Sequence, residues 1–421
     1  MATARTGSNS GAAIKPGAEH DTGWILAGLF RSTGIQIGIV LVGGLVLLHG
    51  EDRLTPVKLA YLVVTGLVVL NATAHSLHLR KTAIGRSVAP LFVSSLALLG
   101  MLGISFLVAA GNEGTASDWL RDSSPYLLLA ATPFLAVSLR ATSSPGFVKG
   151  LLVATGGLTA ISFWIYFASR RNLPSPGSEF LLPSFYLPAA LFAYATTVAI
   201  RERRRAWLWT LLAFGVLSLI FLSGTRTTLI FLAAPVVVLL LASRRGPVLA
   251  RIAVALIAFV VAWTVTLPAG GVGTQEATQR LTRTIAGDQS VRDRSRQTEA
   301  ARRTWEEHPI LGVGPGHFFQ WDNSGFTTRS FTIDTPVSYV AKFGVPGLLF
   351  LVIAGISLTM FCRERLRDPI SREGATALVG FTAIAVAGIP FFVPIEDKGF
   401  ALGWLLLLTL ALPDRSSSPA E

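Results

Sequence analysis

The sequence predicts an all-α polytopic membrane protein with about twelve transmembrane helices and one large extracytoplasmic loop. Apolar runs close to 20 residues, long enough to cross a bilayer, recur along most of the 421-residue chain. Charged residues make up only 14% of it, against about 25% in a typical soluble protein. One long segment, residues 268–342, interrupts this pattern with a run of Arg and Glu and a glycine-rich stretch.

The apolar segments are expected to be helices, because backbone groups in lipid have to be satisfied within the segment itself. The last of them is short, and Lys398 can extend it by reaching toward the headgroups. The segments lie at about 32–49, 57–77, 87–110, 124–140, 147–169, 180–200, 206–222, 227–243, 248–267, 343–362, 374–394 and 398–413.

Lys and Arg residues between the segments predict the orientation. One set of short loops carries sixteen of them and the other set carries seven, so the first set and both termini are expected in the cytoplasm. The chain then divides into a disordered cytoplasmic N-terminus (1–23), helices 1–9 (24–267), the extracytoplasmic loop (268–342), helices 10–12 (343–413) and a cytoplasmic tail (414–421).

Composition also excludes several classes of site. The single cysteine, Cys362, allows no intramolecular disulfide and has no metal-site spacing. The net charge of +12 is explained by loop arginines, and no nucleic-acid-binding motif is present. Ionisable residues within the apolar segments are nearly absent, which weakens a proton-coupled transporter without excluding it.

Within the loop, residues 291–309 read as an amphipathic helix. Asp288 or Ser290 can cap its start, and Pro309 ends it. Glu299 and Arg303 are four residues apart in the favourable order for an ion pair. Residues 310–336 are expected to be irregular and rich in aromatic side chains.

At 100° per residue, Arg294, Thr298, Ala301 and Trp305 share one stripe of this helix. A Trp on a membrane-proximal helix tends to sit at headgroup level, which would bring Arg294 close to phosphates. The alternative is that the arginines only solvate a surface helix or contact anionic lipid.

Two turns complete the candidate site. In "GVGPG", Gly312, Gly314 and Gly316 surround a proline, and the exposed N–H groups of such a turn can approach a phosphate or sugar. A plain turn is the alternative. In "SGTRTT", Arg226 lies at the outer face just before a helix, where a forked donor suits phosphate. A topology-setting arginine would look the same.

These two pieces together resemble the O-antigen ligase and Wzy-type polysaccharide polymerase superfamily. Its signature joins a Ser-x-x-Arg-type turn, here "SGTRTT", to an outer-loop helix with an Arg about fifteen residues before "hPllGvGpgxF". Arg294 is fifteen residues before Pro309, and "HPILGVGPGHF" matches. The following "VSYVAKFGVPG" resembles the family's "L-x-x-x-x-E-x-G-x-x-G". The clear resemblance covers roughly residues 206–360 and does not separate ligase from polymerase.

The resemblance implies a GT-C-like membrane glycosyltransferase in the cytoplasmic membrane. Such enzymes move a glycan from an undecaprenyl-diphosphate donor to an acceptor hydroxyl on a glycan, lipid or protein, at the outer face. It implies no cofactor and no metal. Arg226 and Arg294 would bind the diphosphate, whereas Trp305, Gly312, Gly314 and Gly316 would shape the loop. The stretch 308–321 would then form the floor or lid of the site.

The base is less clear, because the family often has His-Asn eleven residues before Gly344, where this chain has Ile333 and Asp334. Asp334 is the nearest candidate base, and His317 in "GPGHF" is the other. Asp334 could equally cap the next helix, and His317 could be an ordinary turn residue.

Two other functions remain open: a multi-span transporter or flippase, and a non-catalytic relative, which the missing histidine would favour. The aromatics Phe318, Phe319 and Trp321 could stack on sugar or dock on lipid. The sequence does not predict the sugar, the linkage, the acceptor or the oligomeric state.

Overall fold

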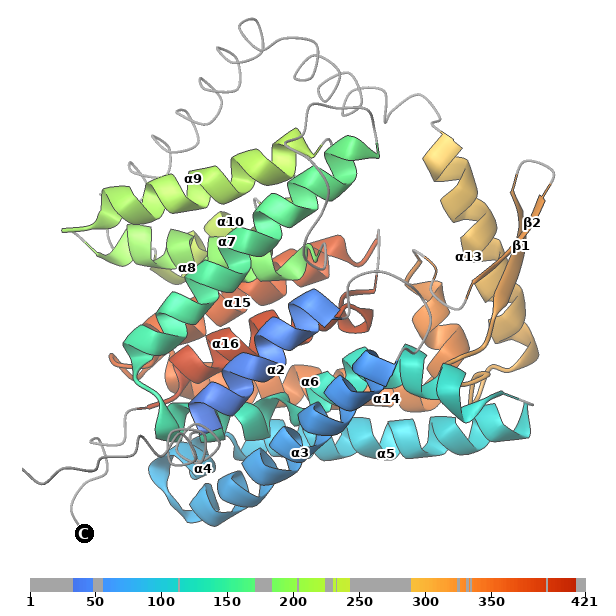
Figure 1. The fold of residues 1–421 in the computed structure, drawn as a ribbon, viewed down its shortest axis with the longest axis horizontal. Helices are drawn as coiled ribbons and strands as arrows, with labels where there is room; N and C mark the ends of the chain where they lie inside the picture. The colour runs from blue at the N-terminus through green and yellow to red at the C-terminus, as the bar shows by residue number, and fades with distance from the viewer. Residues whose placement is uncertain are drawn as a thin grey trace, which may run out of the picture.

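A computed structural model describes most of the chain and shows a helical membrane protein (Figure 1). The described residues are 33–47, 56–112, 114–170, 184–202, 204–223, 230–231, 233–242, 289–323, 326–330, 333, 335–390 and 393–413.

A helix lies at each predicted apolar segment that falls within the described residues. The segment 248–267 lies outside them. The helices before the loop are α2 (Thr33–Leu47), α3 (Pro56–His78), η1 (Leu79–Lys81), α4 (Ala83–Ser87), α5 (Ala89–Gly111), α6 (Ala116–Thr142), α7 (Pro145–Ser169), α8 (Tyr186–Arg201), α9 (Ala206–Leu222) and α10 (Ala233–Ala242). Those after it are α14 (Val337–Arg365), α15 (Arg372–Gly388), η4 (Pro394–Glu396) and α16 (Lys398–Ala411).

Five of the described helices are long and apolar enough to cross a membrane. They are Leu59–His78 within α3, α5, α6, α7 and α14, while α9 and α16 are shorter apolar helices. This confirms the membrane class and the helical fold. The total of twelve spans stays a prediction.

Side-chain caps set where several of these helices begin. The Thr115 hydroxyl accepts a hydrogen bond from the N–H of Asp118 at 3.1 Å and so starts α6. The Ser144 hydroxyl does the same for Phe147 in α7, at 3.3 Å. Each cap satisfies an N–H group that has no partner within its helix, and this fixes the helix start.

Two helices begin earlier than the hydropathy pattern predicted. Helix α6 starts at Ala116 rather than near 124, and α14 starts at Val337 rather than near 343. The added turns are polar and include Asp122 and Lys342, which the apolar segments left out. Both side chains are buried, so these turns belong to the helix bundle and not to its loops.

The loop contains the predicted amphipathic helix, α13 (Gln289–Glu307), and a β-hairpin that was not predicted. Strands β1 (Phe319–Asn323) and β2 (Phe326–Ser330) are antiparallel, with Phe319 opposite Ser330 and Asn323 opposite Phe326. The expectation that this aromatic stretch is irregular is therefore wrong. Its aromatic and β-branched residues favour a strand.

The loop elements lie at one end of the bundle, beside the ends of α5, α6 and α14 (Figure 1). The main apolar core joins α6, α8, α15 and α16. A smaller core under the loop joins α13, β1 and the start of α14 through Ala301, Phe319, Ile333 and Ala341. The loop is thus packed onto the helices rather than suspended above them.

Candidate functional site

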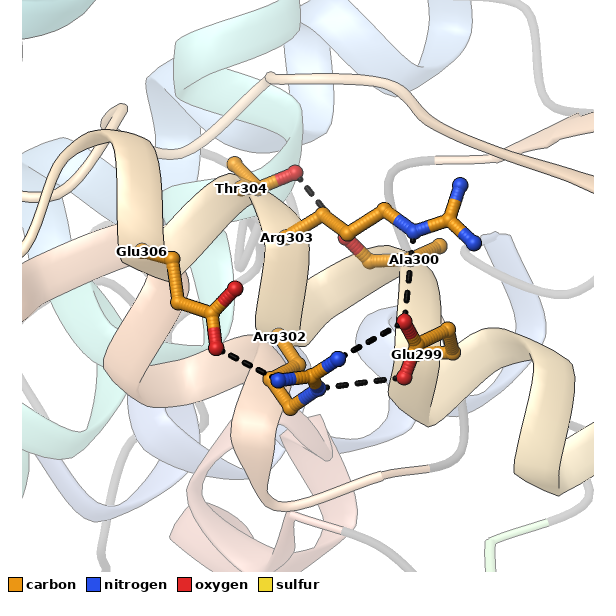
Figure 2. Close-up of polar contacts among 6 residues, drawn as sticks. All are labelled: Glu299, Ala300, Arg302, Arg303, Thr304 and Glu306. Atoms are coloured by element: carbon orange, nitrogen blue, oxygen red, sulfur yellow. Dashed lines mark hydrogen bonds and ion pairs between the residues drawn. The ribbon is translucent and has the colours of Figure 1, made fainter.

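One face of α13 carries a chain of ion pairs and points away from the core (Figure 2). The predicted pair of Glu299 and Arg303 is present at 3.2 Å. Arg302 bridges Glu299 at 2.9 Å and Glu306 at 2.6 Å. Hydrogen bonds from Arg302 and Arg303 lower the pKa of the exposed Glu299 carboxyl. This face is solvated.

The opposite face of α13 packs on the start of α14. Ala301 is fully buried, and the Thr298 hydroxyl donates to the Thr335 hydroxyl at 3.0 Å. Arg294 lies one turn before Thr298 and is half-buried. Trp305 is 38% exposed at the other end of the stripe. Thr298 and Ala301, in the middle of the stripe, therefore face the region where α14 begins.

The GVGPG turn is buried, and its N–H groups are hydrogen-bonded within the protein. The N–H of Val313 donates to the Ala341 carbonyl at 3.0 Å, and that of Gly314 to the Lys342 carbonyl at 2.9 Å. Gly312 donates to the His308 carbonyl at 3.0 Å, and Gly316 to the Asp122 carboxylate at 2.7 Å. The expectation of exposed N–H groups ready for a phosphate is therefore wrong.

The turn and α14 are interlocked at two glycines. Gly312 has φ +68°, and a Cβ there would lie 2.4 Å from the Lys342 carbonyl oxygen. Gly344 has φ +53° and ψ −141°, breaks the helical path of α14, and would place a Cβ 2.3 Å from the Ile310 carbonyl oxygen. At this break the Val345 N–H donates to the same oxygen of Ile310 at 2.8 Å. Only glycine allows the two backbones to come this close.

A buried charged cluster lies beneath the turn. The Lys342 ammonium group is fully buried and lies 3.0 Å from Asp122 Oδ1 and 3.0 Å from Glu396 Oε1. The Tyr126 hydroxyl donates to the same Glu396 oxygen at 2.9 Å. Burial raises the pKa of the Glu396 carboxyl, Lys342 opposes this, and the Asp122 charge adds to it. The cluster joins α6, η4 and α14 to the loop.

His317 follows the turn and lies half-buried beside the small core. Its ring meets that of Phe319 edge to face, with 5.3 Å between centroids. Burial lowers the pKa of His317, and the nearby His308, Arg329 and Lys342 lower it further. The imidazole is therefore neutral near pH 7, which is the form that accepts a proton.

The structure brings some of the predicted residues together and leaves others untested. Arg294 and Trp305 lie on α13, and the three turn glycines and His317 lie between α13 and β1. Arg226 and Asp334 lie outside the described residues, although Ile333 and Thr335, which flank Asp334 in the sequence, contact the inner face of α13.

The predicted aromatic surface is smaller than expected. Phe319 is 1% exposed and belongs to the small core, so it cannot dock on lipid or sugar. Phe318 instead lies under the Arg329 guanidinium, 4.3 Å from ring centroid to Cζ. Trp321 is half-buried against the same core.

Four polar residues of the region were missed from the sequence: Asp122, Tyr126, Lys342 and Glu396. Hydropathy windows hid them, because each lies at or near the polar edge of an apolar segment. One signal was available. Lys342 stands where the motif "L-x-x-x-x-E-x-G-x-x-G" carries Glu, and a reversed charge beside a span requires counter-charges nearby.

Comparison with known proteins supports the resemblance. No curated protein matches the chain. A family model described as O-antigen ligase matches residues 210–352, which include most of α9, α10, α13, the GVGPG turn, the hairpin and the first half of α14. Members of this family are membrane glycosyltransferase-like ligases and polymerases. The match over residues 210–352 therefore supports the similarity of this chain to the O-antigen ligase and Wzy-type polymerase superfamily.

Proposed function

We propose that the chain is a glycosyltransferase of the cytoplasmic membrane that uses a lipid-linked donor. It takes glycan from undecaprenyl diphosphate at the outer face and transfers it to an acceptor hydroxyl on a growing glycan, a lipid or a protein. The observation that carries the proposal is the family match, which spans the "SGTRTT" turn and the whole folded loop assembly. Transfer of this kind requires no nucleotide sugar and no metal.

Arg294 and Arg226 are proposed to bind the diphosphate. As the bond at C1 of the donor sugar breaks, negative charge grows on the departing diphosphate, and a guanidinium group stabilises that charge. Arg294 is supported by its place on the half-buried stripe of α13, one turn from the contact between Thr298 and Thr335. Arg226 is proposed from the motif alone.

The acceptor hydroxyl must lose its proton as it attacks C1, and a positioned base contributes roughly 10²–10⁴-fold. Asp334 is the first candidate from the sequence. His317 is supported by its half-buried place and by its lowered pKa, which keeps the ring neutral at pH 7. The turn glycines hold the segment that carries His317, and Trp305 holds α13 at the membrane surface.

A transfer assay tests the proposal. Purified protein in lipid nanodiscs is given a fluorescent acceptor and an undecaprenyl-diphosphate-linked glycan, and product is separated by electrophoresis. The expected result is a longer or newly joined glycan in the wild type and loss of product in Arg294→Ala. Arg303→Ala is the matched control, because Arg303 lies on the solvated face of the same helix. Equal activity in both variants would contradict the role of Arg294.

The same assay separates the two bases. Asp334→Asn keeps the shape of the side chain and removes its basicity. Loss of transfer in Asp334→Asn with donor binding retained would assign the base to Asp334. Near-normal transfer there, with loss in His317→Ala, would assign it to His317. Transfer that survives both changes would mean that departure of the diphosphate and the two arginines suffice.

A transporter is the second candidate, and one observation favours it. The Lys342 cluster places ionisable side chains inside the bundle, as proton-coupled carriers do. Its Lys and two carboxylates are paired with one another, however, and lie beside the loop at one end of the bundle. Movement of lipid-linked glycan across proteoliposomes without any new glycosidic bond would identify a transporter.

A further inference from the structure

The buried charged cluster touches the part of the loop that carries His317. The two oxygens of Asp122 have different partners: Oδ1 accepts from the Lys342 ammonium group at 3.0 Å, and Oδ2 accepts from the Gly316 N–H at 2.7 Å. Gly316 directly precedes His317. The Asp122 carboxylate therefore connects the buried Lys342 ammonium group to the backbone next to His317.

The surroundings of this carboxylate leave it little freedom. The side chain of Asp122 is 5% exposed and that of Lys342 is 0% exposed. Lys342 is also held through its own carbonyl, which accepts from the Gly314 N–H at 2.9 Å. Lys342 of α14 is thus joined to the turn twice: its carbonyl accepts from the Gly314 N–H, and its ammonium group pairs with Asp122, which accepts from the Gly316 N–H.

We propose that Lys342 is a positioning residue for the transfer site. Its ammonium group holds Asp122 against the Gly316 N–H, and this fixes the backbone from which His317 projects. The inference rests on the proposed function only in giving His317 a part in transfer. We call the two contacts of Asp122, to the Lys342 ammonium group and to the Gly316 N–H, the clamp. The clamp is a property of the folded loop, and its effect on His317 can be measured without any reaction.

Glu396 provides a matched comparison within the same cluster. It lies at the same 3.0 Å from the Lys342 ammonium group as Asp122 does, but its other contact is the Tyr126 hydroxyl and not the turn. In Asp122→Asn, one amide oxygen must replace two acceptors, so a contact to Lys342 or to Gly316 is lost. In Glu396→Gln, the amide oxygen can still accept from both Lys342 and Tyr126.

The transfer assay then tests positioning directly. Asp122→Asn is expected to lower kcat by about tenfold or more with a smaller change in KM, because an ill-placed base loses part of its roughly 10²–10⁴-fold effect. The kcat of Glu396→Gln is expected to stay within about threefold of the wild-type kcat. Equal losses in the two variants would overturn the proposal, because a merely structural cluster would not distinguish its two carboxylates.

A second measurement needs no transfer. Imidazole NMR signals of the six histidines are followed with pH, and the His317 signal is assigned from its absence in His317→Gln. His317 is faced by Lys342 from α14, by Arg329 from β2 and by His308 and Glu307 from the end of α13. Asp122 of α6 contacts the adjoining Gly316.

Lys342→Met removes one of the positive charges that lower the pKa of His317, so the pH at which His317 titrates should rise. Lys149→Met is the control, since the Lys149–Glu373 pair at 3.2 Å links α7 to α15 away from the loop. An unmoved His317 titration in folded Lys342→Met would show that Lys342 does not act at His317 and would overturn the proposal. Should that variant not fold, Lys342→Met combined with Glu396→Gln restores the net charge of the cluster, and the His317 titration should still rise, because Lys342 and not Glu396 is among the groups that shift the pKa of His317. If the wild type transfers nothing, the proposed function fails and the titration alone decides the clamp.

Discussion

Replacing Gly312 with alanine should separate the turn from α14. The residue has φ +68°, and an L side chain in that region costs roughly 1–2 kcal/mol. The new Cβ would also lie 2.4 Å from the Lys342 carbonyl oxygen and 2.7 Å from that of Ala341. Neither atom can move without shifting α14, and such overpacking costs roughly 1–3 kcal/mol. Together the two effects amount to roughly 2–5 kcal/mol.

Gly355→Ala is the matched control, because Gly355 lies in the same α14 with nothing within 4 Å of an added Cβ. Reversible unfolding by SDS in mixed micelles, followed by tryptophan fluorescence, measures both variants. Gly312→Ala should raise the equilibrium constant for unfolding by roughly 30-fold to several thousand-fold, since 1.4 kcal/mol is a factor of ten. Gly355→Ala should match the wild type. If Gly312→Ala and Gly355→Ala have the same free energy of unfolding, the close contact between the turn and α14 is contradicted.

Three further predictions concern the site, its titration and the topology. Arg294→Lys and Arg226→Lys should each lose most transfer activity, because an ammonium group cannot reproduce a bidentate guanidinium fork; activity within twofold of the wild type would contradict this. Burial lowers the pKa of His317 below 6.5, so its contribution to stability is present above that pH and is lost as pH falls through the lowered value. Unfolding of His317→Gln and the wild type between pH 7 and 5 checks this, and parallel curves would refute it. A cysteine placed at Ser324 should react with an impermeant reagent from outside and one at Ser371 should not; the reverse pattern would overturn the orientation.

Sequence periodicity predicted the elements that can be recognised from residues close together in the sequence. The apolar segments and α13 follow from hydropathy and from the 3.6-residue repeat, and the pair of Glu299 and Arg303 follows from spacing alone. The end of α13 at Glu307 agrees with Pro309 as a stop. These features need no knowledge of distant parts of the chain.

The features that failed depend on distant partners. The N–H groups of the turn are satisfied by carbonyls near 341 and by Asp122, which is 194 residues from Gly316 in the chain. Hydropathy placed Asp122 and Lys342 outside the spans, because a charged residue ends an apolar window. A hydropathy window takes no account of a counter-ion that is distant in the sequence. The hairpin was missed although aromatic and β-branched residues flank Ser324 and Gly325, which is a recognised hairpin pattern.

The pairing of Asp122 has a consequence for how the chain is made. Its partner Lys342 lies 220 residues later, and Glu396 follows 54 residues after that. At roughly 5–20 residues per second, synthesis of 220 residues takes on the order of 10 to 40 s. During that time α6 is already available for insertion while its carboxylate still awaits the lysine. The first half of the protein therefore reaches its final packing only after the last helices have been synthesised, and a chain cut off before α14 would keep an acidic side chain at a membrane helix with no cation to neutralise it.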